Sequence, residues 1–237
     1  MKARLLLALF LTLVAVGARA EAVDPDALVR KMAARDKELA RHRAAYVCTV
    51  REERQWLDAD GKTVKTRTEE KTLRGDASSD REAQKKEMES ESGVKAGAEQ
   101  ASHEEPFSIL KIVDHYRYAL TGEETVDGVP CYKVRFAPKP GQPFRSREEK
   151  VANQMEGYLW IAKGDLSLVR NEGRLTRPVS VAWFFATLRE VEFSFRAAPL
   201  PNGEMGPARI EYRFRVAVPF GEIHERHIRT MTRYRMK

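Results

Sequence analysis

The sequence predicts a mainly β protein of the α+β class. About nine antiparallel strands are expected to form one strongly curled sheet, an open half-barrel, with an N-terminal helix and one or two short helices covering its concave face. Two observations predict this class. Segments rich in Val, Ile, Tyr, Phe and Trp recur along the chain, and many of them alternate apolar with polar residues as strands do. Short links rich in turn-forming residues join most of these segments, so consecutive strands should be antiparallel and form a meander that curls.

The first 20 residues predict a secretory signal peptide. Lys2 and Arg4 precede an apolar run from Leu5 to Val16, and residues 18–20 read Ala-Arg-Ala, which fits a cleavage site. The run is shorter than the roughly 20 residues of a membrane-spanning helix, so a cleaved leader is preferred to an uncleaved anchor. The mature chain, 21–237, is therefore expected to be a single soluble domain exported to the periplasm.

Cleavage would also change the charge of the protein. The full chain of 237 residues carries 42 basic and 35 acidic residues, a net charge of +7. Without Lys2, Arg4 and Arg19 the basic residues fall to 39, which leaves a net charge of +4. These charges are spread along the chain, and export argues against nucleic acid as a partner. A mildly basic surface could attract anionic lipid headgroups, but solubility is the simpler interpretation.

An amphipathic helix should open the mature chain. Asp24 can cap it, Pro25 suits its first position, and apolar residues then recur at helical spacing until the helix ends near Arg43. This helix is expected to pack on the sheet rather than on another protein, because one face of the sheet needs a cover.

Nine segments have the character of strands, and a tenth apolar run does not alternate. Asp60-Gly61 and Asp127-Gly128 indicate tight hairpin turns, and Gly164 is expected to supply a positive φ in the central hairpin. Residues 75–105 are polar and are interpreted as an exposed insertion. The strand segments are 46–57, 64–73, 115–120, 129–137, 157–161, 166–173, 188–195, 208–218 and 223–236, and the apolar run is 177–188.

Two stretches resemble exported proteins of the outer-membrane lipoprotein-sorting superfamily, the LolA-like proteins. One is residues 120–138, LTGEETVDGVPCYKVRFAP, and the other is Gly-Tyr-Leu-Trp-Ile at 157–161, followed by Leu-Val-Arg-Asn-Glu-Gly at 168–173. An Asp commonly follows the Trp-Ile pair in that superfamily, whereas Ala162 stands here. The resemblance implies a half-open barrel with an apolar cavity that receives acyl chains of lipids or lipoproteins. It also implies an inner- or outer-membrane receptor protein as a further partner.

Aromatic residues of the later strands are the candidates to line such a cavity or to cover it. Aromatic residues at strand spacing more often belong to the core, so each has this simpler interpretation as well. The run of three at 183–185 lacks a strand period and could form a flap over the mouth. The candidate residues are Trp160, Trp183, Phe184, Phe185, Phe193, Phe195, Tyr212 and Phe214.

The sequence contains no pattern that indicates catalysis, a cofactor or a metal. His224 and His227 should point to opposite faces of one strand, and neither a nucleophile elbow nor a phosphate loop is present. Cys48 and Cys131 fall in separate strands, so a disulfide and two buried free thiols are equally acceptable.

Three functional hypotheses follow, and we rank them in this order. The first is a non-enzymatic periplasmic carrier or chaperone for lipid or lipoprotein acyl chains. The second is a sensor or interaction module on the same fold that binds a regulatory or envelope protein. The third, an exported enzyme with an unrecognised site, is the least favoured.

Overall fold

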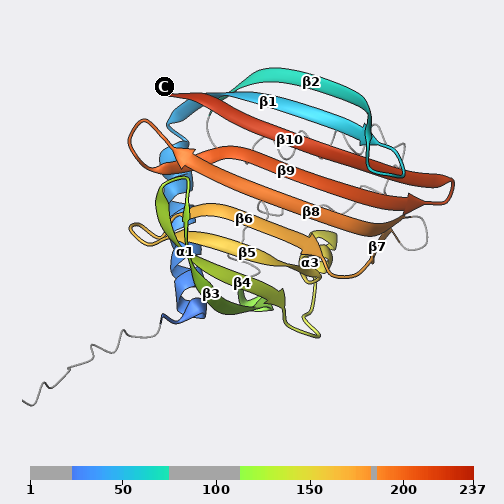
Figure 1. The fold of residues 1–237 in the computed structure, drawn as a ribbon, viewed down its shortest axis with the longest axis horizontal. Helices are drawn as coiled ribbons and strands as arrows, with labels where there is room; N and C mark the ends of the chain where they lie inside the picture. The colour runs from blue at the N-terminus through green and yellow to red at the C-terminus, as the bar shows by residue number, and fades with distance from the viewer. Residues whose placement is uncertain (1–22, 75–112, 183–185) are drawn as a thin grey trace, which may run out of the picture.

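A computed structural model describes residues 23–74, 113–182 and 186–237, and in these ranges the chain is mainly β (Figure 1). The predicted signal peptide, the polar insertion 75–105 and the predicted flap at 183–185 lie outside the described residues. Within the described ranges, no helix has the length and apolar character needed to span a bilayer.

Helix α1 (Pro25–Arg43) forms as the sequence predicts. The side chain of Asp24 caps it by accepting a hydrogen bond of 3.0 Å from the backbone N–H of Asp26. Basic residues in the last turn favour the negative end of the helix dipole. Its buried stripe includes Leu28, Val29, Met32, Ala33 and Leu39. α1 lies across one end of the sheet and packs against it there (Figure 1).

The strands form one antiparallel ten-stranded sheet that is not closed into a barrel, which confirms the predicted fold class. The tenth strand is β7, which forms within the apolar run and, among the described strands, pairs with β8 alone. The strands are β1 (Tyr46–Leu57), β2 (Thr63–Arg74), β3 (Tyr116–Val126), β4 (Val129–Pro138), β5 (Met155–Ala162), β6 (Leu168–Leu175), β7 (Val179–Ala182), β8 (Ala186–Pro199), β9 (Met205–Val218) and β10 (Gly221–Met236).

The order of strands in the sheet differs from a simple meander. It runs β2-β1-β10-β9-β8-β6-β5-β4-β3, so the first hairpin pairs with the last strand and not with β3. The connection from β2 to β3 is long, and a long connection can carry the chain across to the opposite edge of the sheet. Consequently β1 and β4 are separated by five intervening strands, β10, β9, β8, β6 and β5.

The turns follow local chemistry, with one correction. Asp127 and Gly128 both have positive φ (49° and 82°), as a tight two-residue hairpin turn requires. In the central hairpin the residue with positive φ is Leu166 (φ 60°), and the prediction that Gly164 would have it is wrong. The loop there is longer than a two-residue turn, and Asp165 supports it by accepting hydrogen bonds from the backbone N–H and the hydroxyl of Ser167 (3.0 and 2.7 Å).

Two short helices accompany α1 in the described ranges: η2 (Val113–His115) and α3 (Arg147–Ala152). None of the elements predicted from the sequence includes α3, so this helix was missed. Its local signal is a capping pattern, because the hydroxyl of Ser146 accepts from the N–H of Glu149 at 3.2 Å. The carboxylate of Glu149 in turn accepts from the N–H of Arg145 at 2.6 Å.

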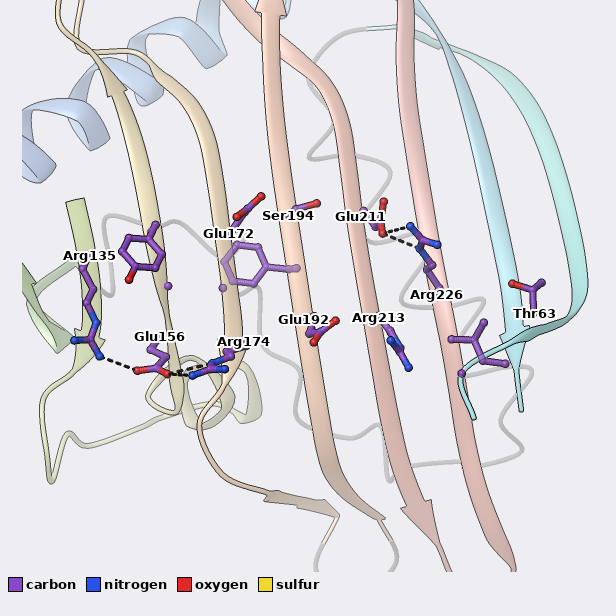
Figure 2. Close-up of a pocket in the computed structure, with 16 residues that line it drawn as sticks. Thr63, Arg135, Glu156, Glu172, Arg174, Glu192, Ser194, Glu211, Arg213 and Arg226 are labelled. Atoms are coloured by element: carbon purple, nitrogen blue, oxygen red, sulfur yellow. Dashed lines mark hydrogen bonds and ion pairs between the residues drawn. The ribbon is translucent and has the colours of Figure 1, made fainter. Parts of the chain in front are cut away.

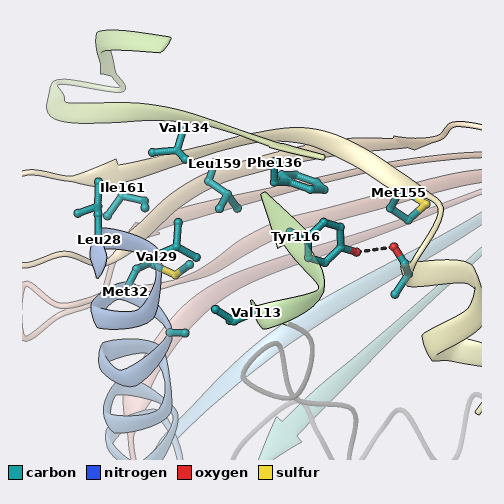
Figure 3. Packing of buried hydrophobic residues seen from close by; sticks show 12 residues of the cluster. Leu28, Val29, Met32, Val113, Tyr116, Val134, Phe136, Met155, Leu159 and Ile161 are labelled. Carbon is teal, nitrogen blue, oxygen red and sulfur yellow. Dashed lines mark hydrogen bonds between the residues drawn. The ribbon is translucent and has the colours of Figure 1, made fainter. Parts of the chain in front are cut away.

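The main core lies between α1 and strands β3 to β5 (Figure 3). Met32 of α1, Val134 of β4 and Ile161 of β5 have no measurable exposure (0%). Tyr116 packs edge-on against Phe136, and its hydroxyl donates to the backbone carbonyl of Ala152. This core fixes which side of the sheet faces α1, and we call that side the helix face.

The opposite side of the sheet is called the open face. The register places Arg135, Tyr158, Glu172, Ser194 and Glu211 side by side across five strands of this face. A second buried cluster, around Trp160 and Cys131, lies toward one end of it. Because strand side chains alternate, the two faces have different compositions, and each is a candidate binding surface.

Candidate functional site

A shallow hollow of about 740 Å³ crosses the open face (Figure 2). Its floor comes from β4, β5, β6, β8, β9 and β10, and one wall comes from the hairpin that joins β1 to β2. The lining is dominated by charge, unlike the mostly apolar lining of common small-molecule sites. It comprises Leu57, Gly61, Thr63, Arg135, Glu156, Gly157, Tyr158, Glu172, Gly173, Arg174, Glu192, Phe193, Ser194, Glu211, Arg213 and Arg226.

Most charges in the hollow are paired with a neighbour. Glu156 binds Arg174 at 2.9 Å and Arg135 at 3.3 Å, and the hydrogen bond from Arg174 is the main reason that its pKa lies below the ordinary value. Burial raises the pKa of Glu211, but hydrogen bonds from Arg209 and Arg226 outweigh burial and lower it overall. These carboxylates therefore remain charged acceptors at neutral pH and are unsuited to donating protons.

Glu192 and Arg213 are an exception at the centre of the hollow. They are direct partners in the β8–β9 register, yet no ion pair joins them, and neither forms an ion pair with another described residue. Arg213 is held elsewhere: its Nε–H donates to Nε2 of His224 at 3.0 Å. Figure 2 shows the two side chains on neighbouring strands, with no interaction joining them.

His224 attaches the β1–β2 hairpin to this face. Arginine can only donate, so Nε2 of His224 must accept, and its Nδ1 then carries the proton and donates to the backbone carbonyl of Asp58 at 2.9 Å. Arg215 adds a hydrogen bond of 3.3 Å to the carbonyl of Ala59. Gly61 suits this turn because its φ is +80°, and its lack of a side chain lets Nη2 of Arg213 approach the position where a Cβ would lie to 2.6 Å.

The helix face carries the aromatic residues that the sequence analysis selected from β8 and β9. Phe193, Phe195, Tyr212 and Phe214 are all half-buried, and we call these four residues the aromatic strip. Phe193 packs against the α1 core, whereas Phe195 packs against the cluster of Trp160. Tyr212 and Phe214 stack on each other with their ring centroids 6.3 Å apart.

The remaining candidates lie elsewhere. Trp160 is 3% exposed and belongs to the second buried cluster. Its indole N–H donates to Glu124 at 3.0 Å, and Lys133 and Arg170 lie over its ring. Trp160 is thus a buried residue, and the aromatic strip reaches its cluster through Phe195. The other three candidates, Trp183, Phe184 and Phe185, are outside the described residues.

A buried charge network adjoins the aromatic strip on the helix face. Glu225 is 3% exposed and receives two hydrogen bonds of 2.9 Å from Arg54 and one contact of 2.8 Å from His227. Burial raises the pKa of Glu225, but the hydrogen bonds from His227 and Arg54 outweigh burial and leave the pKa below its ordinary value. The ring of His227 also stacks on Tyr212, with centroids 4.9 Å apart.

Sequence reasoning missed this network and the charged hollow. Arg54 and Glu225 are far apart in the chain, and both are charged residues in strands, which normally indicates a solvated face. The sequence contained one indication of the network: in the 46–57 segment, charged residues share a face of the predicted strand with apolar residues.

The cysteines and histidines are also placed by the sheet. Cys48 in β1 and Cys131 in β4 are both buried free thiols, which decides between the two alternatives, because five strands separate them. Burial raises the pKa of the Cys131 thiol. His224 and His227 point to opposite faces as predicted. Among the described residues, no group of three or more His, Cys, Asp or Glu side chains could hold a metal ion.

No protein-family model and no curated protein matches this chain. Solved structures resemble it weakly. A DUF1329 family protein from Desulfovibrio piger is 14% identical, with 91% of this chain and 94% of that chain covered and a TM-score of 0.37. A LolA superfamily protein from Nitrosomonas europaea is 12% identical, with 91% and 94% covered and a TM-score of 0.35. MucB, in its complex with MucA from Pseudomonas aeruginosa, is 11% identical, with 91% and 99% covered and a TM-score of 0.30.

The structural neighbours thus include the superfamily that the sequence resembles. The identities are at most 14% and the TM-scores at most 0.37.

Proposed function

We propose that the protein is an exported, non-enzymatic binding protein of the periplasm, and that it shelters lipid or the acyl chains of lipoproteins as in outer-membrane lipoprotein sorting. The observation that supports this proposal is the aromatic strip. Phe193, Phe195, Tyr212 and Phe214 lie next to one another on β8 and β9, on the same face as α1, and each stays only half-buried in the chain.

The energetics of such a surface suit an acyl chain. Each methylene that leaves water contributes about 0.8 kcal/mol, so about ten methylenes on the strip would contribute ~8 kcal/mol before ordering costs. Arg54 and His227 lie beside the strip on the same face, where the acyl chain's polar end could approach them. We expect the acyl chain to contact the strip and its polar end to lie toward β10 and β1.

Native mass spectrometry of protein purified from a periplasmic extract tests this function. We expect co-purified lipid, and we expect a Phe214→Ser variant to retain at least fivefold less, because a polar hydroxyl replaces an aromatic ring in the strip. Tyr158→Ser on the open face is the matched control and should leave the retained lipid unchanged. The proposal is wrong if delipidated protein takes up no lipid, or if both variants lose uptake equally.

The second candidate is a sensor or interaction module that binds a regulatory or envelope protein. The observation that favours it is the charged hollow, since its polar lining is unsuited to an acyl chain and typical of the polar part of a protein interface. A protein that co-purifies with the chain in place of lipid would favour this candidate over the carrier.

A further inference from the structure

We propose that the hollow on the open face binds an extended polypeptide segment that carries charges of both signs, with Arg213 taking a carboxylate and Glu192 an ammonium or guanidinium group of that segment. This inference rests on the second candidate function and names the chemistry of its partner and its site.

Glu192 and Arg213 carry opposite charges at the centre of the hollow. The register places Glu192 opposite Arg213, and such cross-strand neighbours usually attract each other. Here the Nε–H donor of Arg213 is committed to His224, and Gly61 of the β1–β2 hairpin lies over its Nη2. The side chain is thereby held away from Glu192, so one anion and one cation remain available to a ligand.

The lining of the hollow is balanced in charge. It contains four glutamates (Glu156, Glu172, Glu192, Glu211) and four arginines (Arg135, Arg174, Arg213, Arg226). A ligand of one sign would meet as many repulsive as attractive groups, and an apolar ligand would bury these charges without replacing their water. A ligand that carries both positive and negative charges can pair with both kinds of group, so it avoids both the repulsion and the burial of unpaired charges.

The size of the hollow and its uncharged groups also suit an extended peptide. It crosses from β4 to β10, five strand spacings of about 4.8 Å, or about 24 Å in total. An extended peptide covers that span with about seven residues. Tyr158, which is 37% exposed, offers an aromatic surface of the kind that dominates peptide recognition, and the hydroxyls of Ser194 and Thr63 offer additional hydrogen bonds.

Fluorescence anisotropy with a labelled eight-residue peptide of two Lys-Lys-Glu-Glu repeats, blocked at both ends, tests the site on the full exported chain. Because the side chains of an extended peptide alternate between its two faces, each face of this peptide carries both Lys and Glu. Matched peptides of eight Lys, eight Glu, and alternating Ser and Gly provide the comparison. We expect binding of the mixed Lys-Glu peptide alone, weakened by added salt. Glu192→Gln and Arg213→Gln should each weaken it about tenfold, as loss of a charge-assisted hydrogen bond does.

The matched controls are Arg189→Gln and Glu222→Gln, which remove an ion pair of 3.3 Å between β8 and β10 outside the lining. They should leave peptide binding unchanged. Glu192 is exposed, so its variant is expected to fold normally, which thermal unfolding of each variant verifies.

Three outcomes would overturn the site: no binding of the mixed Lys-Glu peptide, equal binding of the all-Glu or all-Lys peptide, or no effect of either central variant. A further result distinguishes an error in this binding site from an error in the proposed interaction module. A protein partner retained equally by the wild type and Glu192→Gln would uphold the interaction module and place its interface elsewhere. Lipid uptake, which depends on the opposite face, should be the same in all four variants.

Discussion

Replacing Gly157 with alanine is expected to destabilise the sheet by about 3 kcal/mol, at the upper end of the range for overpacking. Gly157 of β5 pairs directly with Gly173 of β6. A Cβ at position 157 would lie 1.8 Å from the carbonyl oxygen of Glu172 and 2.6 Å from Cα of Gly173. Both atoms belong to the backbone of the neighbouring strand, so no side-chain rotation relieves the clash. Chemical denaturation of the purified variant measures the loss.

Gly164→Ala is the matched control for this experiment. No heavy atom lies within 4 Å of a Cβ built at Gly164, and its φ is not in the left-handed region. Alanine there restricts the unfolded chain and should leave stability unchanged or raise it by about 0.4–1 kcal/mol. Equal stabilities for Gly157→Ala and the wild type would mean that β5 and β6 do not pair in the register described.

Replacing Arg54 with methionine is the second change with a large expected effect. It removes the two hydrogen bonds to Glu225 and leaves that buried carboxylate with His227 as its remaining partner among those described. Breaking a buried ion pair from one side costs about 3–5 kcal/mol, and the contact with His227 places this case near 3 kcal/mol. Urea denaturation of the variant measures this loss.

Two comparisons test the cause of this loss. The double variant Arg54→Met with Glu225→Leu should recover much of the stability, because no uncompensated charge then remains buried. Arg174→Met removes the arginine of an exposed pair, with 72% of its side chain accessible, and should cost less than about 1 kcal/mol. A double variant no more stable than Arg54→Met would show that Arg54 stabilises the fold by contacts other than this pair.

The effect of Arg54→Met should also depend on pH. The folded-state pKa of Glu225 lies below its ordinary value, so its ion pair stabilises the fold above the unfolded-state pKa of about 4.5. This stabilisation declines as the pH falls through the lower folded-state pKa, where the carboxylate is protonated. The difference in stability between wild type and Arg54→Met should therefore be largest near neutral pH and shrink below about pH 4.5.

Local sequence signals predicted much of the fold. The limits of β1 match the predicted segment 46–57, and α1 begins at Pro25 after its cap Asp24 and ends at Arg43, because alternation, capping and helical spacing act over a few residues. Asp127-Gly128 formed its turn for the same reason. The prediction of a positive φ at Gly164 was wrong because the position of the positive φ depends on the length of the loop. A glycine by itself does not reveal that length.

The candidate site depended on distant pairings, and the sequence could not supply them. The pairing of β1 with β10 brings Arg54 to Glu225, and the hollow needs side chains from six neighbouring strands and the β1–β2 hairpin. Charged strand residues such as Glu192 and Arg213 therefore looked like an ordinary solvated face. The aromatic residues Phe193, Tyr212 and Phe214 were selected by alternation, which gave their common face but not their buried charged neighbours.

The most direct test of the carrier is to locate an acyl chain on the sheet. Delipidated protein carrying ring-labelled tyrosine is titrated with spin-labelled stearic acid, and paramagnetic broadening of each tyrosine ring is measured by NMR. Tyr212 lies in the aromatic strip, and Tyr158 lies on the open face. We predict strong broadening of the Tyr212 ring and little change at Tyr158. Broadening of Tyr158 with Tyr212 unaffected, or no broadening at a saturating concentration, would contradict the account.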